Sequence, residues 1–165
     1  MRDKFHKIVV CLVLVGSYFF LPKYGFTSFD NIPAHILYPF SHANIWHLAA
    51  NILCLWMIPC RTYIFVTYLI AVLCSFLPSI SLYDCIAQGG LAAPSEPTYG
   101  FSGVLFAIVG ISWGKVHRFR DMFWKNKWYL IIPAFFPHVN ILIHVYCLLA
   151  GYLYGTLCDR KSKNS

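Results

Sequence analysis

Charged residues are scarce in this chain, and acidic residues are the scarcest. Only 12% of the 165 residues are charged, whereas soluble domains carry about 25%. All six acidic residues fall outside the long apolar runs: Asp3, Asp30, Asp84, Glu96, Asp121 and Asp159. This placement excludes a buried carboxylate-based pathway for protons or cations. It also excludes the aspartate of a Ser-His-Asp triad within those runs.

Paired cysteine spacings and metal-ligand spacings are absent as well. Most of the seven cysteines lie within apolar runs, where cysteine behaves as a small hydrophobic residue. Basic residues outnumber acidic ones by 13 to 6, but they cluster in short segments between the apolar runs, as topology signals do. The sequence therefore predicts no disulfide framework, no metal site, no cofactor and no nucleic-acid partner.

Apolar residues make up 59% of the chain and predict an all-α, multi-pass membrane protein embedded in a lipid bilayer. We expect a single domain over residues 1–165 with six spans: 8–21, 45–59, 63–82, 101–116, 128–139 and 140–157. A span needs about 20 residues, and flanking Lys and Arg side chains can extend the shorter ones. The fifth run contains two prolines, which leaves a full crossing and a kinked segment as alternatives.

The basic residues also predict an orientation. If the spans alternate across the bilayer, twelve of the thirteen basic residues share one side: three before the first span, one after the second, five from the end of the fourth (Lys115) to the beginning of the fifth, and three in the tail. The positive-inside rule then predicts that both termini are in the cytoplasm. We expect the protein to lie in the cell membrane (plasma or inner membrane). The second, fourth and sixth spans consequently all begin on the non-cytoplasmic side.

A polar residue lies near the beginning of each of these three spans. They are His47, with Asn51 one turn later, then Ser102 and His144. His47, Ser102 and His144 all lie within about two helical turns of the non-cytoplasmic face of the bilayer. A Ser-His dyad fits this set, because an imidazole can take the hydroxyl proton while serine attacks a carbonyl. Asn51, His47 and the Ser102 backbone N–H can stabilise the oxyanion. Spacing alone leaves open whether His47 or His144 is the base.

Small residues predict how the fourth and sixth spans pack. Two G-x-x-x-G pairs mark these spans: Gly110 with Gly114, and Gly151 with Gly155. Small residues let two helix backbones approach closely in lipid. His144 lies on the same stripe as the second pair, so this packing should bring Ser102 toward His144.

Taken in order, these motifs resemble the rhomboid family of intramembrane serine proteases. The resemblance is carried by Phe40-Ser41-His42, His47-Leu48-Ala49-Ala50-Asn51, Gly100-Phe101-Ser102-Gly103 and His144 with Gly151. It implies that Ser102 is the nucleophile, that His144 is the base, and that His47 and Asn51 stabilise the oxyanion. Gly100, Gly103 and Gly151 would be structural residues near the site. The implied substrates are transmembrane segments of other proteins, cut near the outer face.

Two other hypotheses stay open. A pseudoprotease of the same fold would bind membrane proteins without cleaving them, although the intact Ser102 and His144 argue against it. A haem or metal protein of the membrane would use histidines as ligands: His42, His47, His138 and His144. Histidine is a common ligand, but no cysteine or carboxylate completes a metal motif here.

Overall fold

The computed structural model describes residues 2–27, 31–58, 64–92, 97–116, 118–128, 131 and 139–163. The described helices are α1 (Arg2–Phe20), α2 (Ile32–Leu37), the 3-10 helix η1 (Tyr38–Phe40), α3 (Ile45–Met57), α4 (Ile64–Ser75), α5 (Leu82–Gln88), α6 (Ser102–Lys115), α7 (Phe119–Asn126) and α9 (Ile141–Lys163). Within these residues β-pairing is limited to two isolated bridges, Phe26 with Thr98 and Ser81 with Asn140. The predicted all-α class is confirmed.

One described helix, α9, is long and apolar enough to cross a membrane, over Ile141–Arg160. Its outward face exposes Leu149, Leu153 and Leu157, which recur at every fourth residue as on a lipid-facing stripe. Three further apolar helices are shorter, namely α3, α4 and α6. The six spans therefore stay a prediction, and most of the predicted fifth run (129, 130 and 132–138) lies outside the described residues.

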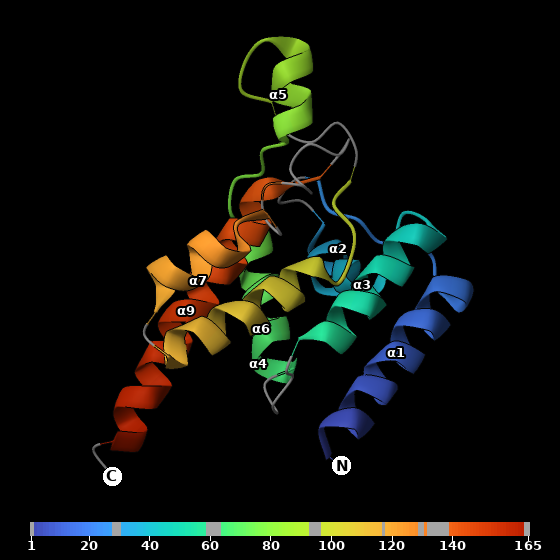
Figure 1. Cartoon of the computed structure of the whole chain (residues 1–165). Helices are drawn as coiled ribbons and strands as arrows, with labels where there is room; N and C mark the ends of the chain where they lie inside the picture. Colours follow the sequence, from blue (N-terminus) through green and yellow to red (C-terminus); the bar gives the residue numbers. More distant parts are fainter. Residues whose placement is uncertain are drawn as a thin grey trace.

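Helices α6 and α9 lie side by side (Figure 1) and make the most extensive helix–helix contact of the described residues. A Cβ added to Gly110 would collide with the carbonyl of Leu148, and one added to Gly151 would collide with the carbonyl of Ala107. The same contact recurs one turn later, at the second glycine of each motif. The close packing predicted from the two G-x-x-x-G pairs is confirmed.

These contacts show that α6 and α9 run in the same direction. Helix α7 follows α6 along the chain, with the Phe119 ring 5.7 Å from Trp113 and 5.0 Å from Tyr152. The sequence predicts no helix in this basic segment. Its apolar residues at positions 119, 122 and 123 have helical spacing and pack against α6 and α9.

The third predicted span, 63–82, is too long. Helix α4 ends at Ser75, whose Oγ donates to the Val72 carbonyl at 2.6 Å. Pro78 follows, and a proline disfavours helical geometry in the residue before it. The chain then forms α5, which projects from one end of the bundle (Figure 1).

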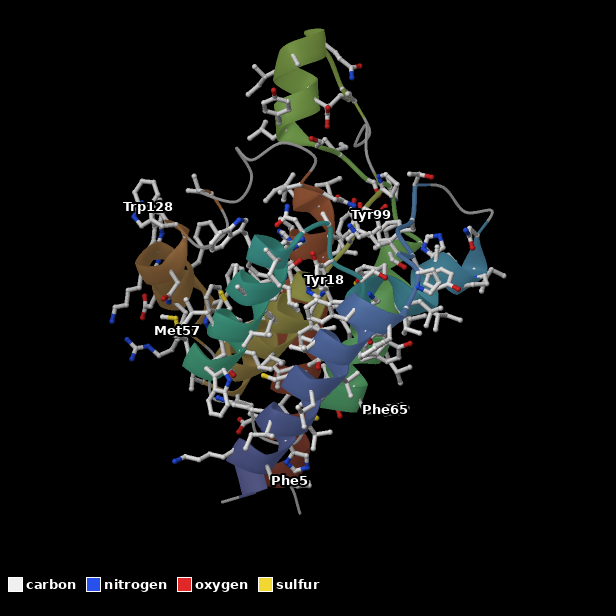
Figure 2. All side chains as sticks on the ribbon, turned by 90° about the vertical axis from the view of Figure 1, so that its right-hand side faces the viewer. Phe5, Tyr18, Met57, Phe65, Tyr99 and Trp128 are labelled. Atoms are coloured by element: carbon white, nitrogen blue, oxygen red, sulfur yellow. The ribbon has the colours of Figure 1, made fainter. Side chains whose placement is uncertain are left out.

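Both termini lie at the end of the bundle opposite α5 (Figure 1). Figure 2 shows Tyr99, which precedes Gly100, toward the α5 end and Phe5 of α1 at the other end. Near that second end, the Lys7 ammonium donates to the carbonyls of Trp56 at 3.2 Å and Ile58 at 2.7 Å. A cation is favourable at the C-terminal end of a helix, so Lys7 ties α1 to the end of α3.

Candidate active site

A tight turn before α6 places Ser102 at the first position of that helix. Gly100 adopts a φ of 110°, a backbone conformation that glycine accepts and other residues resist. Its N–H donates to the Tyr38 carbonyl at 3.0 Å, which anchors the turn to η1. Phe101 is buried beside it. The serine hydroxyl thus stands at a helix N-terminus on an anchored turn.

His47 and Asn51 reach this turn from α3. The side chain of Asn44 caps α3 by accepting the His47 N–H at 2.9 Å. A Cβ added to Gly100 would lie 2.6 Å from His47 Cε1 and 3.5 Å from Asn51 Nδ2. The imidazole and the amide therefore flank the backbone that leads into Ser102. Asn51 is buried, and its Nδ2 donates to the His47 carbonyl at 3.0 Å.

His144, in the first turn of α9, meets the serine directly. Its Nε2 lies 2.8 Å from Ser102 Oγ. The ring stacks on Phe106, with centroids 4.5 Å apart and planes at 27°. His144 is 6% exposed, and its Nδ1 is buried with no hydrogen-bond partner among the described residues. When Nε2 accepts the serine proton, the ring's own proton is on Nδ1.

Of the two histidines that the sequence offers, the structure brings His144 to the Ser102 hydroxyl and His47 to the Gly100 backbone. The two rings thus hold different positions around one turn. A base must be within hydrogen-bond reach of the proton that it takes. His144 meets that requirement.

Two of the three predicted structural glycines lie at the site, and the third lies further along α9. Gly100 flanks the serine, as described above. A Cβ added to Gly103 would lie 2.9 Å from the Tyr38 hydroxyl and 3.4 Å from Cys147 Sγ. Gly151 lies about two turns from His144, where it contacts the backbone of α6.

Comparison with known proteins agrees with this arrangement. The family model of the rhomboid domain matches residues 31–161. The chain belongs to the rhomboid family. It is also 28% identical over 152 residues to a provisionally named rhomboid protein of Acanthamoeba polyphaga mimivirus, covering 90% of this chain and 88% of the viral one. The family is known for serine intramembrane proteases that act on membrane proteins within the bilayer.

Two further residues of this rhomboid, Tyr38 and Phe106, contact the site, although the sequence predicts no role for them. Tyr38 is buried, and its hydroxyl donates to the Ala71 carbonyl at 3.1 Å while its own carbonyl holds Gly100. Phe106 carries the stacking contact with His144. Nothing in the spacing of the chain marks either residue, because each acts through a contact across helices.

His42 lies behind His47, with ring centroids 5.3 Å apart. It is 1% exposed, and burial, with a smaller contribution from His47, lowers its pKa to about 3. His42 is therefore neutral. Of the other proposed metal-binding histidines, His138 lies outside the described residues. Within the described part of the chain, no group of three metal-ligating side chains comes together.

Proposed function

We propose that this rhomboid is an intramembrane serine protease in which Ser102 is the nucleophile and His144 is the base. The observation that carries the proposal is the 2.8 Å contact between His144 Nε2 and Ser102 Oγ. That distance is within the range of a catalytic nucleophile–base pair. The two residues are 42 positions apart in sequence, so the contact depends on the packing of α6 against α9.

The chemistry follows from this pair. Ser102 Oγ attacks the carbonyl carbon of the scissile peptide bond while its proton passes to His144 Nε2. The imidazolium then gives that proton to the leaving amine, and the acyl-serine ester is hydrolysed by a water that the same nitrogen deprotonates. In place of a carboxylate partner, the Phe106 ring stacks on the imidazole and stabilises its positive charge by a cation–π contact.

The oxyanion of the tetrahedral intermediate needs donors that are already in position. The Ser102 backbone N–H stands at the first position of α6, where helical N–H groups lack a partner within their own helix. Asn51 uses one of its two amide hydrogens on the His47 carbonyl and has the other for an oxyanion. The His47 ring, which lies against Gly100, supplies the third donor.

Substrates in this proposal are transmembrane segments of other membrane proteins, cut near the non-cytoplasmic face. Three helix beginnings carry the site, and both chain termini lie at the far end of the bundle (Figure 1). This arrangement and the positive-inside rule together support a proposed orientation with both termini in the cytoplasm and the serine toward the outer side.

A reconstituted cleavage assay tests the proposal. Wild type and the Ser102→Ala variant would be placed in liposomes with a single-span test protein whose transmembrane segment carries glycine and proline near its outer end. We expect cleavage by wild type, with the cut site located by mass spectrometry, and none by the variant. Equal cleavage by a folded Ser102→Ala variant would overturn the proposed mechanism, and binding of the test protein without cleavage by wild type would indicate the pseudoprotease instead.

A further inference from the structure

A buried asparagine lies where the segment of the serine and the segment of the histidine meet. Asn140 immediately precedes α9, one turn before His144, and is 4% exposed. Thr98, four residues before Ser102, is buried next to it. The mechanism proposed above uses neither residue, yet both lie on the chain segments that carry the two members of the dyad.

Both the oxygen and the nitrogen of the Asn140 side-chain amide form hydrogen bonds. Its Oδ1 accepts the Ile143 N–H at 3.3 Å, which caps the first turn of α9. A backbone N–H can only donate, so this bond fixes which end of the amide is the oxygen. Nδ2 then donates to Ser79 Oγ at 2.9 Å and, at a longer 3.4 Å, to Thr98 Oγ1.

Backbone bonds fix the same junction. The Ile141 N–H donates to the Ile80 carbonyl at 3.2 Å, and the Thr98 N–H donates to the Phe26 carbonyl at 2.9 Å. The first bond ties the beginning of α9 to the connection from α4 to α5, and the second ties the segment before the serine turn to the connection from α1 to α2. The Asn140 amide bonds to the beginning of α9, to the connection from α4 to α5 and to the segment before the serine turn.

We infer that Asn140 is a positioning residue that sets the approach of His144 to Ser102. The inference rests on the proposed function, because the distance that it controls is the one between nucleophile and base. Its physical basis is that a buried amide group without partners is costly, so the three segments are held where the amide is satisfied. A misplacement of about 1 Å at a catalytic group can cost about a hundredfold in rate.

Two substitutions separate the bridge from the helix cap. Asn140→Ser keeps an oxygen that can cap α9 but is too short to reach Ser79 and Thr98, whereas Asn140→Ala removes both functions. Asn31→Ala is the matched control, because the Asn31 side chain caps α2 in the same way, accepting the Ala34 N–H at 3.2 Å. Thr98→Val removes the oxygen on the serine side and leaves Asn140 in place.

The first readout is the rate at which a fluorophosphonate labels Ser102 in the purified full-length protein. We expect Asn140→Ser and Asn140→Ala both to label at least about tenfold more slowly than wild type, as misplacement of the base requires. Thr98→Val should change the rate in the same direction by less, and Asn31→Ala should stay within about twofold. A wild-type rate in Asn140→Ser would show that the residue only caps the helix and would overturn the inference.

The second readout does not need a reaction. The ¹⁵N NMR signal of His144 Nε2 reports its hydrogen bond to Ser102, and Ser102→Ala gives the reference for a broken bond. We expect the signal of Asn140→Ser to move toward that reference. An unmoved signal in the folded variant contradicts the positioning role. The two proposals can also fail separately. If the fluorophosphonate does not label wild type but the His144 Nε2 signal still moves in Asn140→Ser, the result contradicts the proposed protease and supports the positioning role.

Discussion

The backbone of Gly100 lies directly against the imidazole of His47. A Cβ at this glycine would be 2.6 Å from His47 Cε1 and 2.7 Å from Nε2, which is closer than two such atoms can approach. The glycine also holds a φ of 110°, which an L-residue with a side chain rarely adopts. Two independent constraints therefore require glycine two residues before the serine.

Gly100→Ala should consequently abolish activity, with a loss of at least about a hundredfold, because the turn and His47 must move apart. The measurement is fluorophosphonate labelling of Ser102 in detergent. Gly90→Ala is the matched control, because a Cβ there meets nothing within 4 Å, and it should label like wild type. Normal labelling of Gly100→Ala would show that the contact with His47 does not matter.

Asn51→Ala should lower kcat by about 10²–10³ with little change in KM, since an oxyanion donor acts mainly in the transition state. Asn126→Ala serves as the control and should leave kcat unchanged. Asn126 lies on α7, and its amide donates to the carbonyl one turn back, that of Met122, at 2.8 Å, just as the Asn51 amide donates to the His47 carbonyl. Steady-state cleavage of a test substrate gives both constants. If Asn51→Ala and His47→Ala are both silent, the proposed oxyanion site is wrong.

Gly151→Ala should destabilise the bundle, because the added methyl group meets the Ala107 carbonyl across the α6–α9 contact. Overpacking of this kind costs about 1–3 kcal/mol. Thermal unfolding in detergent measures the change, and labelling of Ser102 should slow in parallel as α9 shifts. Gly16→Ala on α1 has open space around its Cβ and should leave the unfolding temperature unchanged or raise it, because alanine favours a helix more than glycine does. Equal unfolding temperatures of the two variants would argue against tight packing at Gly151.

The orientation can be tested with two exposed positions at opposite ends of the molecule. In a background without native cysteines, Gln88→Cys on α5 should react with an impermeant thiol reagent added outside intact cells. Lys4→Cys at the start of α1 should react only after permeabilisation. The reverse pattern would place the serine turn toward the cytoplasm and contradict the orientation read from the basic residues.

The sequence predicted those features of the fold that depend on short-range patterns. The all-helical class and the α6–α9 contact are confirmed, because apolar runs and small-residue stripes express themselves locally. The family resemblance is confirmed as well. The predicted boundaries of the elements were less accurate. Helix α4 ends at Ser75, although the apolar run in the sequence continues to Leu82. Pro78 ends the helix, but the residues around it are still apolar. Helix α7 was not predicted, because a short segment rich in charged residues is also typical of a loop.

Only those site residues that belong to a recognisable sequence motif were predicted. Ser102, His144, His47 and Asn51 lie at recognisable spacings, and the structure brings them around one turn; their chemical roles stay predictions. Tyr38, Phe106 and Asn140 were not assigned to the site, because they reach it through side-chain contacts between distant segments. Asn140 did carry one local signal, as an asparagine directly before an apolar helix, which is typical of an N-cap. Its bonds to Ser79 and Thr98 could not be inferred from that position.

The central claim is that His144 makes Ser102 a nucleophile, and the most direct measurement is mass spectrometry of the purified protein after reaction with a fluorophosphonate. Wild type should carry one adduct, located on Ser102. Ser102→Ala and His144→Ala should carry none, because a serine without a base is a poor nucleophile. An unmodified wild type, or an adduct that persists in folded His144→Ala at the wild-type rate, would contradict the account.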